Sequence, residues 1–144
     1  MITPTSLRAV SGMKTRTIRQ SVTFKVPPRD VYESLMDARR HGRFTGGGAQ
    51  ISRKVGGRFS VFGGWADGSN LVLVPNRKIV QAWRCQQRGW PRDHYSRVTF
   101  SLRRVPGGTR LSLTHSGVPA ATSAAIKQGW WNDYWLPMRE MLEG

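Results

Sequence analysis

The alternation of apolar and polar side chains marks the first regular element of the chain, residues 17–26. Its apolar side chains share one face of an extended chain: Ile18, Val22, Phe24 and Val26. A repeat of two residues is typical of a strand that buries one face and exposes the other. The pattern therefore predicts a half-buried β-strand.

A helical repeat follows the proline pair Pro27-Pro28, and proline is well suited to the first turn of a helix. Apolar side chains recur at Val31, Tyr32, Leu35 and Met36. A short helix over residues 29–36 is predicted from this spacing. The next segment, residues 37–50, contains Gly42 and the run 46–48, which indicates either a loop or a poor second helix.

Short strands separated by turn residues fill the middle of the chain. They are predicted over residues 58–62, 71–74, 78–85, 94–105 and 109–115. The side chains expected to point inward are Ile79, Trp83, Cys85, Ser96, Val98, Phe100, Leu102, Thr109, Leu111, Leu113 and His115. Because the connections are short, neighbouring strands are expected to pair antiparallel.

Aromatic side chains gather on a long helix predicted at the end of the chain, residues 120–142. One continuous stripe at helical spacing contains Ile126, Trp130, Tyr134, Met138 and Met141. Each aromatic ring can bury about 150–250 Å², so this helix is either the lid of a core or the wall of a cavity. Pro137 has no backbone N–H and clashes with the carbonyl four residues earlier, which predicts a kink near Asp133.

The order strand, helix, run of strands and long helix predicts an α+β fold. One curved antiparallel sheet with the long helix across its concave face would bury every apolar face at once. Residues 17–144 are expected to form a single domain, and residues 1–16 a basic, disordered N-terminal tail. That tail lacks the apolar core of about 7–15 residues that a secretory signal needs. No apolar run is long enough to span a membrane.

Positive charge is the unusual feature of the composition. The 144 residues hold 23 Lys and Arg against 8 Asp and Glu, a net charge of +15. Five cations are expected on the outward faces of the strands: Arg19, Lys25, Arg97, Arg103 and Arg110. They form either a docking face for an acidic partner or RNA, or an ordinary solvated surface. The lack of stacking aromatics on that face, Tyr95 aside, argues against an RNA platform.

Residue types that perform catalysis or bind metals are sparse and scattered. The carboxylates form no close pair on an inward strand face, and His41, His94 and His115 have no metal-ligand spacing. We therefore expect no enzyme activity, no metal and no cofactor. The single cysteine, Cys85, is compatible with a reducing compartment, and the cytoplasm is the expected location.

Ordered short motifs then connect this chain to a known family. They are Phe44-Thr45, the runs 55–64 and 75–84, Trp90-Pro91, His94-Tyr95-Ser96, Gly108-Thr109, the run 115–119, Gly129-Trp130 and Tyr134-Trp135. With these motifs in this order, the chain resembles the activator of heat-shock-chaperone ATPase homologue family, which is part of the START-like (SRPBCC) helix-grip superfamily. The resemblance covers residues 17–142.

The resemblance implies a helix-grip fold with a cavity between the long helix and the sheet. In the eukaryotic activators this is the C-terminal domain, and it helps to close the ATPase cycle of the chaperone. Their N-terminal domain, which makes the main chaperone contact, has no counterpart in this sequence. The resemblance therefore implies the helix-grip fold directly, and it implies the co-chaperone role only indirectly.

The candidate site is the space under the last helix, where a small apolar or amphipathic ligand would bind. Its expected lining is Val22, Phe24, Phe62, Trp83, Phe100, Leu113, His115, Trp130 and Tyr134. His115 and the Tyr134 hydroxyl would supply polar contacts. The alternative is that these side chains simply pack against one another as core. Two other functions remain open, a protein-interaction module that modulates a chaperone ATPase and a nonspecific polyanion binder.

Overall fold

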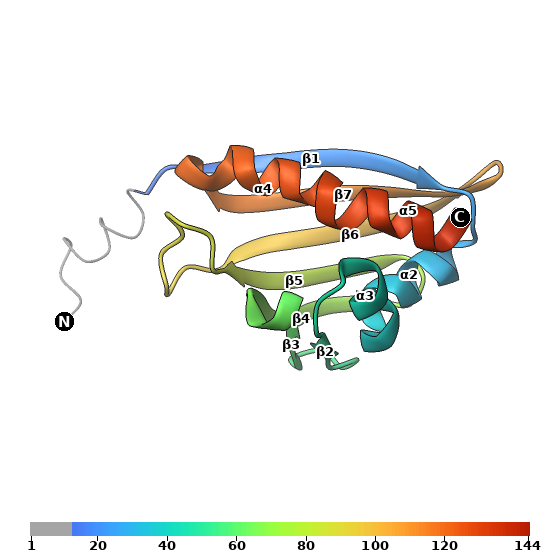
Figure 1. The fold of residues 1–144 in the computed structure, drawn as a ribbon, viewed down its shortest axis with the longest axis horizontal. Helices are drawn as coiled ribbons and strands as arrows, with labels where there is room; N and C mark the ends of the chain where they lie inside the picture. Colours follow the sequence, from blue (N-terminus) through green and yellow to red (C-terminus); the bar gives the residue numbers. More distant parts are fainter. Residues whose placement is uncertain (1–12) are drawn as a thin grey trace.

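A computed structural model describes residues 13–144, so that most of the predicted N-terminal tail, residues 1–12, lies outside the described residues. The described chain forms one antiparallel sheet of order β1-β7-β6-β5-β4-β3-β2 (Figure 1). The strands are β1 (Thr15–Phe24), β2 (Gln50–Ile51), β3 (Arg58–Val61), β4 (Ala66–Val74), β5 (Lys78–Cys85), β6 (Ser96–Val105) and β7 (Gly108–Pro119). The first strand thus pairs with the last, and the predicted α+β fold is confirmed.

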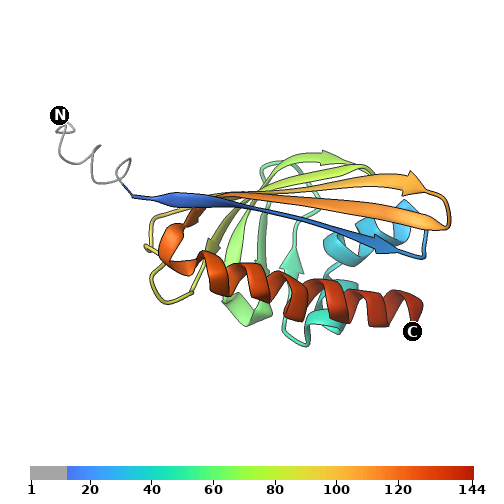
Figure 2. The same ribbon diagram turned by 90° about the horizontal axis from the view of Figure 1, so that it is seen from above.

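The helices lie on one side of this sheet, and the long C-terminal helix runs across it (Figure 2). The helical elements are α2 (Pro28–Met36), α3 (Ala38–Thr45), a short turn (Phe62–Gly64), a first turn of the last helix (Ala120–Thr122), α4 (Ser123–Gly129), a π-helical segment (Trp130–Trp135) and α5 (Leu136–Glu143). The other side of the sheet carries no helix in the described part of the chain.

Helix α3 settles the alternatives for residues 37–50 in favour of a second helix. The Asp37 carboxylate accepts a hydrogen bond from the backbone N–H of Arg40 at 3.2 Å and caps the first turn. Gly46 ends the helix in the left-handed conformation, with φ 76°. The helix holds His41 and Phe44 in the core, so two buried side chains stabilise a segment of poor helix propensity.

The strand prediction gave the buried faces correctly but cut β4 short. That strand begins at Ala66 instead of residue 71. Its missed part contains Gly68, where an added Cβ would lie 1.7 Å from the Ala82 carbonyl oxygen. A bulge between Asn70 and Val72 also interrupts the alternation. Gly68 and the buried Asn70 therefore occupy inward positions where a strand prediction expects apolar side chains. For this reason the first part of β4 was not predicted.

The last helix is distorted at the predicted place, in the form of a π-helical segment. The backbone N–H of Leu136 donates to the Trp131 carbonyl, five residues earlier. Pro137 cannot donate to the carbonyl of Asp133, so the local hydrogen-bond pattern shifts before it reaches the proline. None of the described helices is long and apolar enough to cross a membrane.

Candidate binding pocket under the last helix

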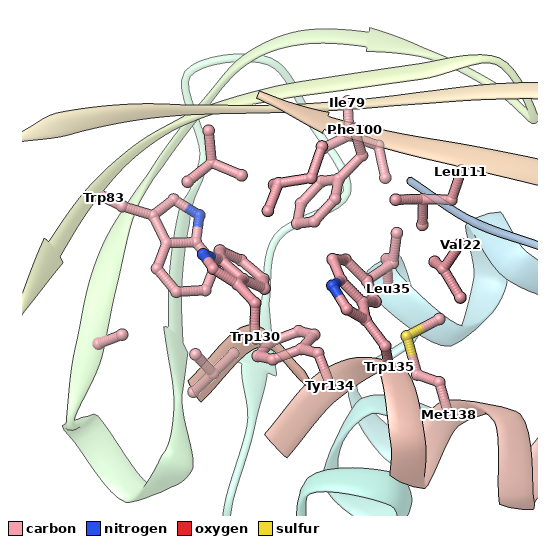
Figure 3. Close-up of a cluster of buried hydrophobic side chains, with 14 of the residues drawn as sticks. Val22, Leu35, Ile79, Trp83, Phe100, Leu111, Trp130, Tyr134, Trp135 and Met138 are labelled. Atoms are coloured by element: carbon pink, nitrogen blue, oxygen red, sulfur yellow. The ribbon is translucent and has the colours of Figure 1, made fainter. Parts of the chain in front are cut away.

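Trp130 is the centre of the aromatic side chains that fill the space beneath the last helix (Figure 3). Its ring centroid lies 5.3 Å from that of Trp83 and 4.6 Å from that of Tyr134. It stacks on Trp135 at 5.4 Å with an interplanar angle of 14°. Phe100 meets the edge of the same indole at 5.7 Å. Ring packs against ring here, so most of the space between helix and sheet is occupied.

The π-helical segment explains why Trp135 belongs to this cluster. The predicted stripe at ordinary helical spacing omits Trp135, yet its side chain is fully buried. A π turn takes more residues than an α turn, so side chains five positions apart come to the same face. Trp130 and Trp135 therefore both face the sheet. The indole N–H of Trp135 also donates to the side-chain oxygen of Gln20 on β1 at 2.7 Å.

His115 is buried on β7 and bonded at both ring nitrogens. Its Nδ1 accepts from the indole N–H of Trp130 at 3.1 Å, and its Nε2 lies 2.7 Å from the Ser96 hydroxyl. An indole can only donate, so the proton of the neutral imidazole sits on Nε2 and is donated to Ser96. Burial lowers the pKa of His115 to about 3. The ring is therefore neutral at physiological pH and joins the sheet to the helix.

A second buried histidine, His41 on α3, makes the equivalent contact with Tyr134. Its Nδ1–H donates to the Leu35 carbonyl at 3.1 Å, and its Nε2 accepts from the Tyr134 hydroxyl at 2.8 Å. Burial lowers the pKa of His41 to about 4, although the bond to Leu35 opposes that shift. Burial likewise raises the pKa of Tyr134 well above its usual value. Both polar groups predicted to contact a ligand thus already have partners within the protein.

A small pocket remains between the turn after β3, the end of β5 and the start of the last helix. Its volume is about 90 Å³. The lining residues are Phe62, Trp65, Trp83, Cys85, Gln87, His115, Ala125, Ile126, Gly129, Trp130, Asp133 and Tyr134. Gln87 and the exposed Asp133 add polar groups to an otherwise largely apolar wall.

The pocket brings together part of the predicted lining. Phe62, Trp83, His115, Trp130 and Tyr134 line it. Val22, Phe24, Phe100 and Leu113 are buried in the same core but do not line the pocket.

Several lining residues escaped the sequence-based prediction for identifiable reasons. Cys85 follows Trp83 on the inward face of β5, so strand alternation could have included it. Burial raises the pKa of this thiol to about 12, and nearby Asp67 acts in the same direction. Trp65 and Asp133 had no such signal, because a short turn and a π-helical segment place them.

A buried polar chain holds Trp83 in place. The Trp83 indole N–H donates to the Gln81 side-chain oxygen at 2.9 Å, and the Gln81 amide donates to Asn70 at 2.9 Å. Asn70 in turn donates to the Ser52 carbonyl at 2.7 Å.

Within residues 13–144 there is no cluster of three or more His, Cys, Asp or Glu side chains that could hold a metal ion.

Comparison with known proteins gives a consistent result. The sequence model of the family "Activator of Hsp90 ATPase homolog 1-like protein" matches residues 25–143. An uncharacterized protein of Schizosaccharomyces pombe is 32% identical over 129 residues, which are 90% of this chain and 38% of that protein. The mouse activator of 90 kDa heat shock protein ATPase homolog 2 is 35% identical over 101 residues, 70% of this chain and 30% of that protein. The chain therefore spans about a third of the length of these relatives.

A solved structure matches over nearly its whole length. It is the crystal structure of an HSP90 activator from Plasmodium falciparum, with a TM-score of 0.81 and 29% sequence identity. The match covers 88% of this chain and 95% of that chain.

Proposed function

The chain belongs to the family of activator of Hsp90 ATPase homolog 1-like proteins, and on this premise we propose that it is a non-enzymatic domain that binds a 90 kDa heat-shock chaperone and stimulates its ATPase. The observation that carries the proposal is the similarity to the Plasmodium falciparum HSP90 activator, which extends over 95% of that chain. Almost the whole of that activator chain thus has a counterpart in this protein.

The filled interior supports a function exercised at the surface. Pockets for drug-sized ligands have volumes of about 300–1,000 Å³, whereas the space under the last helix is about 90 Å³. The whole sequence carries a net charge of +15, and such a charge speeds encounter with an acidic partner. A filled core and a strongly basic composition suit a protein that acts by binding another protein through its surface.

The test is ATP turnover by the 90 kDa heat-shock chaperone of the same organism. Added protein is expected to raise the steady-state rate several-fold and to saturate. An unrelated basic protein of similar size controls for a general effect of positive charge. Turnover that stays at the basal rate up to saturating concentrations would exclude the activator function.

The remaining pocket supports a second candidate function, binding of a small apolar or amphipathic molecule. An engineered apolar cavity of about 150 Å³ holds benzene, so a pocket of about 90 Å³ that opens to solvent suits a ligand no larger than one aromatic ring. The wall of Trp83, Trp130 and Cys85 would contact the ring. Asp133 at the rim would contact a polar substituent.

Phenol is a probe of suitable size, and the indole N–H signals of the tryptophans report its position by NMR. Millimolar phenol is expected to shift the signals of Trp83 and Trp130. Ala125→Trp places a large side chain at the rim of the pocket and should abolish the shifts. Ala124→Trp is the matched control, since Ala124 is exposed but does not line the pocket. Shifts that persist in Ala125→Trp, or that never occur, would contradict ligand binding at this place.

A further inference from the structure

We propose that the outer face of the sheet, opposite the helices, is the docking surface for an acidic protein segment that carries an apolar anchor side chain. The proposal rests on the proposed chaperone-binding function for its biological setting, but its chemistry stands on this surface alone. No helix covers this face in the described part of the chain (Figure 2).

Cations without carboxylate partners occupy four adjacent strands of this face. They are Arg19 on β1, Arg110 on β7, Arg97 and Arg103 on β6, and Lys78 on β5, and all five are exposed. Among residues 13–144 none of the five forms an ion pair. Arg103 and Arg110 even lie directly opposite each other across the β6–β7 pair. Like charges in that position destabilise a sheet, so an external anion would relieve a repulsion that already exists.

Seven of the eight carboxylates of the described chain are located away from this face. Six lie on or next to the helices: Asp30, Glu33, Asp37, Asp133, Glu140 and Glu143. Asp93 is in the loop before β6. On the outer face Asp67 is held by two hydrogen bonds from Arg84, at 2.9 and 3.1 Å, and by Arg58 at 3.4 Å. Apart from Asp67, whose charge is already paired, this face therefore presents cations without carboxylates.

A hollow beside these cations supplies the place for the anchor. Its volume is about 260 Å³, and it is lined by Leu71, Ala82, Tyr95, Ser96, Arg97, Ser116 and Gly117. Leu71 and Tyr95 remain 37% and 40% exposed. The bulge in β4 turns Leu71 out of the regular alternation. Because Ala82 and Gly117 are small, they leave room for a ligand side chain between Leu71 and Arg97. An aliphatic or aromatic side chain would fit there with carboxylates on either side.

The same residues favour a protein segment over nucleic acid. Single-stranded nucleic acid binds to platforms of several stacking aromatics. The exposed aromatic residue beside this face is Tyr95, directly before β6, and the Arg84 guanidinium already covers its ring at 5.1 Å from the centroid. Small hydroxyl side chains occupy the centre of the face instead, among them Ser101, Ser112 and Thr114. They can donate hydrogen bonds to carboxylates.

The test uses a fluorescein-labelled peptide of Glu and Asp residues with one central Phe, and measures its affinity by anisotropy. Replacing Arg97, Arg103 and Arg110 together by Ser is expected to weaken binding about tenfold. The matched control replaces Arg29, Arg39 and Arg43 by Ser, which removes the same charge from exposed positions on α2 and α3. It should leave the affinity nearly unchanged. Leu71→Ser should abolish the advantage of this peptide over the same peptide with Ala in place of Phe.

Each other result overturns the proposal. If the control triple weakens the peptide equally, binding follows net charge and has no defined surface. If a single-stranded oligonucleotide of equal charge binds more tightly through the same arginines, the face is a nucleic-acid interface. Absence of peptide binding excludes the surface outright. Because the peptide assay needs no chaperone, it separates failure of this surface from failure of the activator function, which the ATPase assay measures.

Discussion

Replacing Trp135 by alanine is expected to lower the free energy of unfolding by about 4 kcal/mol. The Trp135 side chain is fully buried, stacks on Trp130 and lies 6.4 Å from Phe100, measured between ring centroids. Its removal would leave a cavity at the centre of the helix–sheet contact. It would also leave the side-chain oxygen of Gln20 without its indole donor, which adds a desolvation penalty. Urea denaturation of the variant and the wild type measures the difference.

Trp131→Ala provides the matched control. It removes the same side chain four positions earlier on the same π-helical segment, where the ring is only partly buried. The expected loss there is about 1 kcal/mol. Equal losses in the two variants would contradict the inward placement of Trp135, and with it the role of the π turn.

Acid is expected to destabilise the protein through its two buried histidines. In the folded state the pKa values of His41 and His115 are about 4 and about 3, against 6.5 in an unfolded chain. The unfolded state therefore binds more protons as the pH falls. The stability from the neutral rings is complete above the unfolded pKa and is lost as the pH falls below it, towards the folded values. The two histidines together predict a loss of about 4 kcal/mol between pH 7 and pH 5.

Urea denaturation at a series of pH values tests this loss. The variant His41→Gln/His115→Gln cannot titrate at these positions, so its free energy of unfolding should depend much less on pH in that interval. Its free energy of unfolding at pH 7 is expected to be lower than that of the wild type. Should the double variant fail to fold, each single variant is expected to remove about half of the pH dependence. An unaltered pH dependence in the variants would assign the acid sensitivity to other groups.

Local patterns were sufficient for much of the fold. Alternation along β6 and β7 identified the buried faces that include Phe100 and Leu113, and both are in the core. The pattern failed where long-range contacts outweigh propensity. Helix α3 is stabilised by burial of His41 and Phe44, and the first part of β4 requires a glycine because the neighbouring strand approaches closely.

In the candidate site, too, local patterns predicted some features and long-range contacts determined the others. Inward alternation selected Trp83 and His115, and both line the pocket. It also selected Phe24 and Leu113, which have the same periodicity but lie deeper in the core. Periodicity reports which face a side chain occupies. It carries no information on where along that face the neighbouring side chains leave space.

The sequence by itself determined which side chains face inward, that a sheet and a long aromatic helix must cover each other, and that the surface is strongly basic. These properties follow from spacing and composition, which are local. Only the tertiary structure decided that aromatic rings fill most of the interior, that His41 bonds Tyr134 from 93 positions away, and that Arg19, Arg97, Arg103 and Arg110 have no carboxylate partner within the described residues. Hydrogen-bond partners, residual volume and ion pairing depend on residues that are distant in the chain, and folding alone brings these together.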